Sequence, residues 1–309
     1  MNDCSAGTPG CSGGEPILAT DWSVNQSGGV HGQLMRAAAV QLNSNADLDR
    51  NLEAAERQVR AAARDGAELV ALPEKWSLLG DSDAILAGAE PLDGPTVSAA
   101  CGWASELGIH LLAGSYAERV EGSEKAANTS LLIDPQGEII ASYRKLHMFD
   151  VDVGGVSYRE SDHEEPGEEI VVAEAAGVPI GLSVCYDLRF PELYRILAVR
   201  GALVFTVPSA FTAPTGRAHW EVLVRARAIE NQAFVVAPNQ FGKAPPHYDS
   251  HGHSMIADPW GAILAEAPEG EGYVAADLDL EGQRRTRAEF PSLANRRADA
   301  YRWPEEVRA

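Results

Sequence analysis

Three residues of different chemistry stand at or near the ends of largely apolar, strand-like segments of this sequence. Cys185 follows the run VPIGLSV and precedes a helix-forming segment that starts at Pro191. Glu74 follows AELVALP, and Lys145 lies in the strand-like stretch EIIASYRKL. A nucleophilic cysteine needs a base to accept its proton and a cation or N–H group to stabilise the oxyanion that forms on attack. These three residues are therefore candidates for a nucleophile, a base and an oxyanion partner.

Each residue also has an ordinary structural interpretation when it is taken alone. Cys185 could be an inert packing residue, because free cysteines are common in cores. Glu74 could be a loop carboxylate without a chemical role. Lys145 could be a surface lysine whose aliphatic stem covers apolar neighbours. Only their joint placement in the fold can decide between the two interpretations.

The segments that must position these residues alternate between strand-like and helix-like patterns. Such alternation is typical of α/β domains in which helices cover the outer faces of sheets. We expect strands at 36–43, 67–74, 109–118, 180–184, 202–209 and 233–240, and helices at 48–66, 94–108, 192–201 and 217–232.

Two similar segments, SLLIDPQGEIIAS and SMIADPWGAILAE, each predict a β-hairpin that turns at Asp-Pro-x-Gly. Proline supplies the fixed φ of a tight turn, and glycine supplies the positive φ that closes it. The chain therefore looks internally duplicated, with two βαβα halves that each end in a hairpin. We expect two similar sheets packed face to face, helices outside them, and a single domain over residues 35–309.

The composition excludes some classes of protein. The 309 residues carry a formal net charge of -20, and 45% of them are hydrophobic. A general nucleic-acid binder needs clustered Lys and Arg, so an acidic chain favours a small-molecule partner instead. No apolar run approaches the length of a membrane span, and we expect no membrane partner.

Residues 1–34 lack both a basic start and a sustained apolar core, so we expect a disordered leader rather than a signal peptide. The four cysteines are too few for a disulfide scaffold and contain no CxxC pair. A reducing compartment fits this cysteine usage, and we expect a cytoplasmic protein.

The segments LPEKW, YRKLHMFD and SVCYDLRFPE, in that order, resemble the three signature segments of the nitrilase superfamily of carbon–nitrogen hydrolases. The resemblance spans Met35 to Tyr301 and implies a four-layer αββα sandwich. It also implies that Glu74 is the general base, Lys145 the oxyanion partner and Cys185 the nucleophile. No metal or organic cofactor is implied.

Supporting residues are also implied by the resemblance. Many members carry a second carboxylate shortly after the lysine, and here HMFDVDVGG offers Asp150 and Asp152, of which we favour Asp152. The alternative is that both aspartates only shape a loop. Glu221 is a secondary site candidate, although it could equally form a helix-surface ion pair with Arg225, four residues later. Tyr186, directly after the nucleophile, is a further candidate for supporting the substrate.

The expected substrate class follows from a second resemblance. The stretches PSAF, TGRAHWEVLVRARAIENQ and GHSMIADPWG resemble the branch that contains deaminated glutathione amidases, with the ω-amidases next. This implies hydrolysis of a small carboxylate-bearing amide, deaminated glutathione, to 2-oxoglutarate and cysteinylglycine. The alternatives are an ω-amidase acting on 2-oxoglutaramate and an N-carbamoyl amidase. An acidic substrate needs a cation, and the candidates are Arg189, Arg217 and Lys243. Arg189 could instead pair with Glu192.

Two alternative hypotheses assign the chain to other functional classes. The cluster PHYDSHGHSM places His247, His251 and His253 close together, which would suit a metal-dependent hydrolase. We favour a structural or pocket-edge role for these histidines, because no carboxylate or cysteine stands at a site-like spacing. The other reading is a catalytically silent binding scaffold, which the complete set of Glu, Lys and Cys argues against.

The resemblance also implies a homodimer or a higher homo-oligomer. The helix expected after Cys185 carries Leu193, Ile196 and Leu197 at spacings of three and four, which makes an apolar stripe. This stripe is a candidate dimer surface, and the alternative is that it faces its own sheet.

Overall fold

The computed structural model describes residues 34–153, 155–244 and 248–301. The expected leader lies outside these residues except for Leu34, which begins the first strand, and His247 also lies outside them. The leader and the domain boundary at residue 35 therefore stay predictions.

The larger sheet has ten strands in the order β15-β14-β1-β2-β3-β5-β4, with β18 paired to β1 and both β6 and β9 paired to β5. Its strands are β1 (Leu34–Leu42), β2 (Leu69–Ala71), β3 (His110–Leu112), β4 (Tyr116–Arg119), β5 (Ala126–Ile133), β6 (Ile139–Arg144), β9 (Glu164–Glu165), β14 (Asn239–Ala244), β15 (Tyr248–His251) and β18 (Gly272–Asp279).

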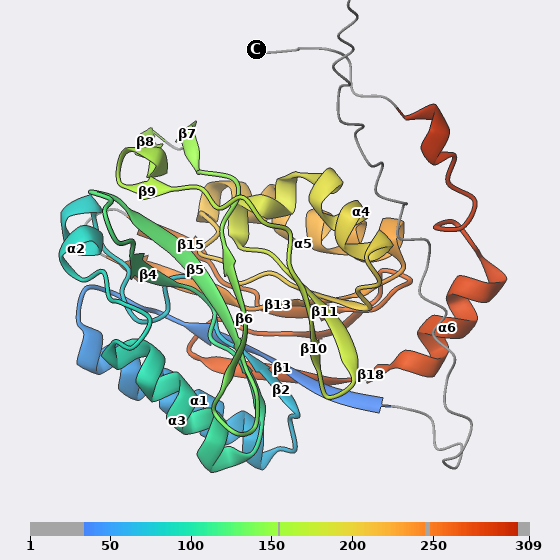
Figure 1. Ribbon diagram of the computed structural model, residues 1–309, viewed down its shortest axis with the longest axis horizontal. Helices are drawn as coiled ribbons and strands as arrows, with labels where there is room; N and C mark the ends of the chain where they lie inside the picture. Colours follow the sequence, from blue (N-terminus) through green and yellow to red (C-terminus); the bar gives the residue numbers. More distant parts are fainter. Residues whose placement is uncertain (1–33, 154, 245–247, 302–309) are drawn as a thin grey trace, which may run out of the picture. The chain divides into compact units, whose positions relative to one another are not determined.

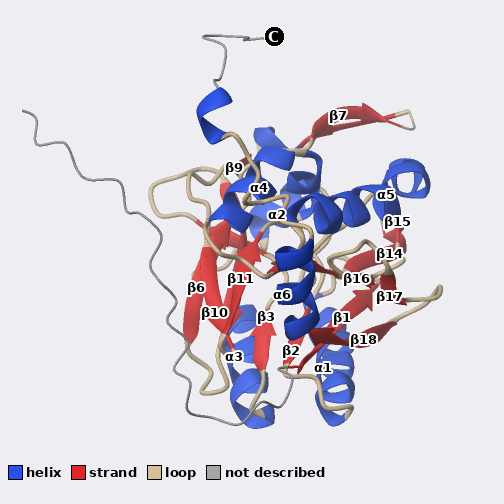
Figure 2. Ribbon diagram, turned by 90° about the vertical axis from the view of Figure 1, so that its right-hand side faces the viewer, coloured by secondary structure: helices blue, strands red, loops and turns tan. Residues whose placement is uncertain are grey.

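The second sheet has six strands in the order β10-β11-β12-β13-β16-β17. They are β10 (Val172–Ala175), β11 (Val178–Leu182), β12 (Val204–Thr206), β13 (Phe234–Ala237), β16 (Met255–Ala257) and β17 (Ile263–Glu266). A separate antiparallel ribbon consists of β7 (Asp150–Val153) and β8 (Val156–Arg159), and Figure 2 shows β7 extending away from the two sheets.

The helices are α1 (Leu48–Arg64), α2 (Ser82–Ala87), α3 (Pro95–Leu107), α4 (Pro191–Val199), α5 (Ala213–Asn231) and α6 (Leu280–Glu289), with 3-10 turns η1 (Glu160–Asp162), η2 (Cys185–Arg189) and η3 (Ala298–Ala300). Figure 1 shows α1 and α3 on one side of the sheets and α4 and α5 on the other.

The side chains of β1 show how the layers are held together. Ala37 and Ala39 belong to the core that contains the second sheet, α4 and α5. Their neighbours Ala38 and Val40 belong to the core formed with α1 and α3. Successive strand residues point to opposite faces, so β1 is buried on both sides and the order of layers is helix, sheet, sheet, helix. The predicted αββα sandwich is confirmed.

The predicted duplication is also present in the strand pairing. In the first half β1, β2 and β3 are parallel, and β5 and β6 continue antiparallel. In the second half β11, β12 and β13 are parallel, and β16 and β17 continue antiparallel. Both hairpins turn as predicted: Gly137 and Gly261 have φ values of 82° and 84°, and the preceding aspartates cap the turns.

Two predicted strands are divided in the structure. The run 233–240 covers β13 and the first two residues of β14, which belong to different sheets. The run 109–118 forms β3 and β4, which are separated at Gly114. Gly114 has a φ of 43°, and a Cβ atom there would lie 2.0 Å from the carbonyl oxygen of Pro73. Glycine is required because the backbone passes directly against the loop that carries Glu74.

The apolar stripe on α4 mostly faces its own sheet. Leu193 and Leu197 are buried in the core, whereas Ile196 is 40% exposed. The alternative weighed for this stripe is therefore correct for two of its three residues. Tyr194, between them in sequence, is also fully buried and exchanges a hydrogen bond with Ser183.

Candidate active site

Glu74 lies in the loop that follows β2, at the carboxyl end of a parallel strand. Its Oε1 accepts hydrogen bonds from Asn128 Nδ2 at 2.9 Å and from Lys145 Nζ at 3.0 Å. Its Oε2 accepts the backbone N–H of Ala210 at 2.8 Å. The side chain is buried, so these donors fix the carboxylate in one orientation.

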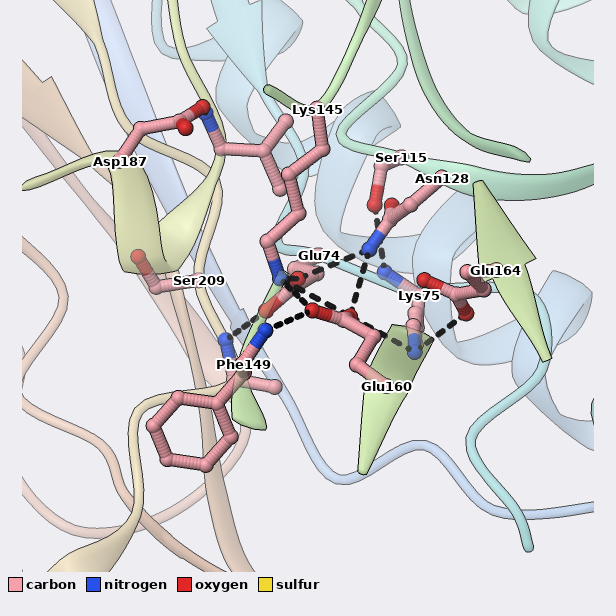
Figure 3. Close-up of polar contacts among 12 residues, drawn as sticks. Glu74, Lys75, Ser115, Asn128, Lys145, Phe149, Glu160, Glu164, Asp187 and Ser209 are labelled. Atoms are coloured by element: carbon pink, nitrogen blue, oxygen red, sulfur yellow. Dashed lines mark hydrogen bonds and ion pairs between the residues drawn. The ribbon is translucent and has the colours of Figure 1, made fainter. Parts of the chain in front are cut away.

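Lys145 follows β6 directly and points into the same buried space (Figure 3). Its Nζ lies 2.9 and 2.7 Å from the two carboxylate oxygens of Glu160, in addition to its bond with Glu74. Burial alone would lower the pKa of Lys145, but the negative charges of Glu160 and Glu74 raise it well above its ordinary value. Lys145 is therefore a fixed ammonium ion.

Cys185 is the first residue of η2, and two residues, Ser183 and Val184, separate it from the end of β11. It has a φ of 45°, which is an uncommon conformation for a residue with a side chain. Its N–H donates to Pro208 O at 2.8 Å. Cys185 is only 8% exposed, so the junction between β11 and η2 is buried.

The thiol of Cys185 is neutral in this environment. Burial raises its pKa well above the ordinary value, and the adjacent Glu74 carboxylate raises it further, while Lys145 opposes the shift. The Cys185 thiol and the Glu74 carboxylate therefore lie close enough to interact, and the proton stays on the sulfur in the free protein.

Asp187 fixes the turn that presents Cys185. Its Oδ2 accepts Val184 N at 2.8 Å and the Tyr143 hydroxyl at 2.6 Å, and its Oδ1 lies 2.6 Å from His147 Nδ1. The aspartate is completely buried. These bonds join η2 to the end of β6, and so connect Cys185 to the segment that carries Lys145.

The carboxylate beside Lys145 is Glu160 and not Asp152. Asp152 lies on the exposed ribbon, with its side chain 68% exposed and paired to Arg159 at 3.0 Å. Asp150 is also exposed and accepts the N–H of Ser161. The ribbon β7–β8 carries both aspartates away from the site and returns the chain so that Glu160, in η1, reaches Lys145.

A pocket of about 330 Å³ opens onto the three predicted residues, and its size suits a small organic ligand. Aromatic, cationic and hydroxyl-bearing side chains share its wall; they include Phe149, Tyr158, Tyr186, Phe211, Arg159, Arg189, Ser82, Thr212 and Thr215. The structure thus places Tyr186 and Arg189 where they were expected, beside Cys185.

Arg189 is not paired with Glu192. In the described part of the chain, its guanidinium contacts His219 Nδ1 at 3.2 Å and lies over the Phe211 ring at 4.9 Å. No carboxylate of the described residues neutralises it. This leaves a cation at the pocket wall.

Three other predicted residues do not line this pocket. Glu221 lies on the exposed face of α5 and pairs with Arg225 at 2.9 Å, which is the helix-surface alternative. Arg217 on α5 and Lys243 on β14 are both exposed.

The two histidines that the structure describes in the predicted cluster stack on each other. The rings of His251 and His253 are 4.7 Å apart, and His253 Nδ1 lies 2.7 Å from Glu266. Burial lowers the pKa of His251 to about 4, with a further lowering from the neighbouring His253. Among residues 34–153, 155–244 and 248–301, no three His, Cys, Asp or Glu side chains are grouped so that they could hold a metal ion.

The sequence did not predict Asn128, Glu160, Lys75 or Asp187 as site residues. Glu160 lies in YRESDHEE, a charged segment that is typical of a solvated loop. Lys75 adjoins the base in LPEKW without any pattern of its own. Only tertiary packing buries these groups, so local periodicity carries no signal for them.

Within the described residues, no helix has the length and apolar character needed to cross a membrane.

Comparisons with known proteins agree with this geometry. A profile of the carbon-nitrogen hydrolase family matches residues 36–288. Deaminated glutathione amidase of Synechocystis sp. is 43% identical over 265 residues, which cover 84% of this chain and 97% of that protein. Omega-amidase NIT2 of Xenopus tropicalis is 36% identical over 267 residues, which cover 86% of this chain and 96% of that protein.

A solved structure shows the same fold. The crystal structure of Saccharomyces cerevisiae Nit3, a member of branch 10 of the nitrilase superfamily, matches with a TM-score of 0.79 and 31% identity over 87% of this chain and 97% of that one. The chain therefore belongs to the carbon-nitrogen hydrolase family. It is a hydrolase of the nitrilase superfamily that acts on amides, as the three signature segments predicted.

Proposed function

We propose that this chain is a cysteine-dependent amidase that hydrolyses a small carboxylate-bearing amide, deaminated glutathione, through a thioester intermediate. The observation that carries the proposal is the buried contact of one thiol, one carboxylate and one ammonium ion at the floor of a single pocket. We propose no metal and no organic cofactor, because these three groups supply every proton and charge that the reaction needs.

In the first half of the reaction, Glu74 accepts the thiol proton while Cys185 Sγ attacks the amide carbon. The carbonyl oxygen becomes an oxyanion, which Lys145 and the N–H of Tyr186 stabilise. Protonated Glu74 then gives its proton to the leaving nitrogen, and the C–N bond breaks. The products of this half are an amine and a thioester on Cys185.

In the second half, Glu74 takes a proton from a water molecule as the water oxygen attacks the thioester carbon. Lys145 and Tyr186 again stabilise the oxyanion, and the C–S bond breaks as the acid forms. The thiolate recovers the proton from Glu74. The fixed donors from Asn128 and Ala210 support this double use, because they keep the carboxylate in place in both halves.

Arg189 is the group that we assign to the carboxylate of the substrate. It lines the pocket without an acidic partner among the described residues, and a guanidinium binds carboxylates through paired N–H donors. The aromatic wall formed by Phe149, Tyr186 and Phe211 would contact the aliphatic part of the acyl chain.

A substrate panel tests this function. Purified protein is incubated separately with deaminated glutathione and with 2-oxoglutaramate, and the release of 2-oxoglutarate, cysteinylglycine and ammonia is measured. We expect the higher kcat/KM with deaminated glutathione. The Synechocystis relative named for this substrate is 43% identical to this chain, against 36% for the Xenopus omega-amidase. A higher value with 2-oxoglutaramate would favour the second candidate, an ω-amidase, which the Xenopus relative supports. Turnover of neither would refute the proposed substrate class.

We further propose that the enzyme is a cytoplasmic homodimer. Both described cysteines, Cys101 and Cys185, are free thiols, which suits a reducing compartment. The outer helices expose apolar side chains that a second copy could cover: Ile196 and Val199 on α4, and Val222 and Ile229 on α5.

A further inference from the structure

A second lysine lies in the buried network behind the nucleophile. Lys75 directly follows Glu74 and has a φ of 52°, which turns its side chain away from that of its neighbour. Its N–H donates to Ser115 Oγ at 3.0 Å, which holds this uncommon conformation. The side chain is 8% exposed and reaches the far side of Glu160 (Figure 3).

The Lys75 ammonium lies between two carboxyl groups. Its Nζ is 2.7 Å from Glu164 Oε1 and 3.4 Å from Glu160 Oε1. Distance alone would make Glu164 the partner. However, neither oxygen of Glu164 accepts a hydrogen bond of good geometry in the described structure, and the side chain is completely buried.

The protonation of the two carboxyl groups shows where the negative charge lies. Burial favours a raised pKa for Glu160, but the charges of Lys145 and Lys75 lower it well below its ordinary value. Burial raises the pKa of Glu164 to about 8, against the effect of Lys75 and with a contribution from Glu160. At neutral pH Glu164 keeps its proton, so the charge of Lys75 acts on Glu160.

Lys145 alone cannot keep Glu160 ionised throughout the reaction. It donates to Glu74 and to both oxygens of Glu160 in the free enzyme. During turnover its ammonium must also stabilise the oxyanion, which draws its charge toward the substrate. A buried carboxylate tends to take up a proton when its positive partner is drawn away. Glu160 would therefore become protonated during turnover if Lys145 were its sole cationic partner.

We propose that Lys75 is a positioning residue of this site: its ammonium keeps Glu160 as a carboxylate, and that carboxylate fixes Lys145 toward the reacting atoms. The inference rests on the proposed function and extends it to a residue that does not touch the substrate. The charged groups closest to Glu160 are Lys145, Lys75 and Glu164, and Asp150 and His163 interact with it through charge. Its oxygens also accept the N–H of Phe149 at 2.7 Å and Asn128 Nδ2 at 3.5 Å.

Three variants separate this role from simple pairing with Glu164. Lys75→Met removes the ammonium, and Lys75→Met with Glu164→Gln removes the whole pair, so that of the two carboxyl groups beside Lys75 only Glu160 is left facing the lost ammonium. Glu164→Gln alone is the matched control. For each variant, kcat, KM and their pH profiles are measured with the amide that the wild type hydrolyses, together with the melting temperature.

If Lys75 positions the site, both variants that lack it lose kcat by about tenfold or more while KM stays within about threefold. Their acidic limb moves to higher pH, because Glu160 with one counter-charge takes up a proton more readily. Glu164→Gln keeps its acidic limb in place. A double variant that recovers wild-type kcat and an unmoved limb would show that Lys75 only neutralises Glu164, and would overturn the proposal. A limb shift in Glu164→Gln toward higher pH would overturn it as well.

Alkylation of Cys185 by iodoacetamide gives a readout that needs no substrate. The rate against pH reports the charges of Glu74 and Lys145 around the thiol. We expect the profile of the double variant to differ from that of the wild type, and the profile of Glu164→Gln to match it. This comparison stays valid if the proposed substrate is wrong, and identical profiles for all proteins would refute the positioning role.

Discussion

At the scale of single residues, Lys145 must pair with two buried carboxylates and also stabilise the proposed oxyanion. Lys145→Ala removes the ammonium that stabilises the oxyanion, so kcat should fall by about a hundredfold or more. Lys145→Arg should not recover it, because a planar guanidinium cannot occupy the space between Glu74 and Glu160 that fits a compact ammonium ion. Steady-state kinetics of both variants check this, and a near-normal kcat for Lys145→Arg would contradict the oxyanion role.

Glu164 gives a prediction about pH and stability. Its pKa is about 8 in the folded chain against 4.5 in an unstructured one, because burial disfavours the ion. The stability that comes from this proton is complete below about pH 4.5 and is lost as the pH rises through about 8. Glu164→Gln stays neutral, so its melting temperature should gain on that of the wild type between those values and then level off. A difference that does not change with pH would contradict the raised pKa.

The three residues of the proposed triad could be located from sequence because each stands at or near the end of a largely apolar, strand-like run. Glu160 could not, because its burial depends on how the ribbon β7–β8 returns the chain to Lys145, and that path is set by tertiary packing. The prediction of Asp152 was wrong for the same reason. Asp152 follows Lys145 closely in sequence, but the ribbon β7–β8 leaves its side chain exposed to solvent.

At the scale of elements, the turn η2 depends on Asp187. Asp187→Ala leaves two buried donors, Tyr143 Oη and Val184 N, and the half-buried His147 without their acceptor. We expect a loss on the order of 3 kcal/mol in the free energy of unfolding, measured by urea denaturation, and a fall in kcat as Cys185 shifts. Asp152→Ala is the control, since that carboxylate is exposed and should change stability by less than about 0.5 kcal/mol. Equal effects of the two substitutions would contradict this account of η2.

The element order could be predicted well because hydrophobic periodicity and turn residues act locally. The two Asp-Pro-x-Gly hairpins and the helices at 48–66 and 94–108 agree with the structure to within a few residues. Strand ends were less predictable. The run 109–118 breaks at Gly114 because a distant loop packs against it, which no local pattern encodes.

At the scale of the whole molecule, the proposed dimer gives a test on α4. Tyr194 is buried, so a charge there would disrupt the core and would not report on assembly. The exposed pair Ile196 and Val199 is suitable instead. Ile196→Asp with Val199→Asp should sediment as a monomer and lose activity, because α4 directly follows the turn that holds Cys185.

The control for this test is Leu92→Asp, which places the same charge on another exposed apolar residue. It should leave both assembly and activity unchanged. A double variant that remains dimeric would show that α4 is not the interface. A monomeric double variant with full activity would contradict the coupling between assembly and catalysis.

The most direct measurement of the central claim is the rate of amide hydrolysis by Cys185→Ala relative to the wild type, with Cys101→Ala as the matched control. Cys101 is the other described free cysteine and lies on α3, away from the pocket-lining residues. The account predicts that Cys185→Ala folds with an unchanged circular dichroism spectrum and loses turnover by about ten-thousandfold, while Cys101→Ala keeps the wild-type rate. A folded Cys185→Ala protein that retains activity within about tenfold of the wild type would contradict a thioester mechanism.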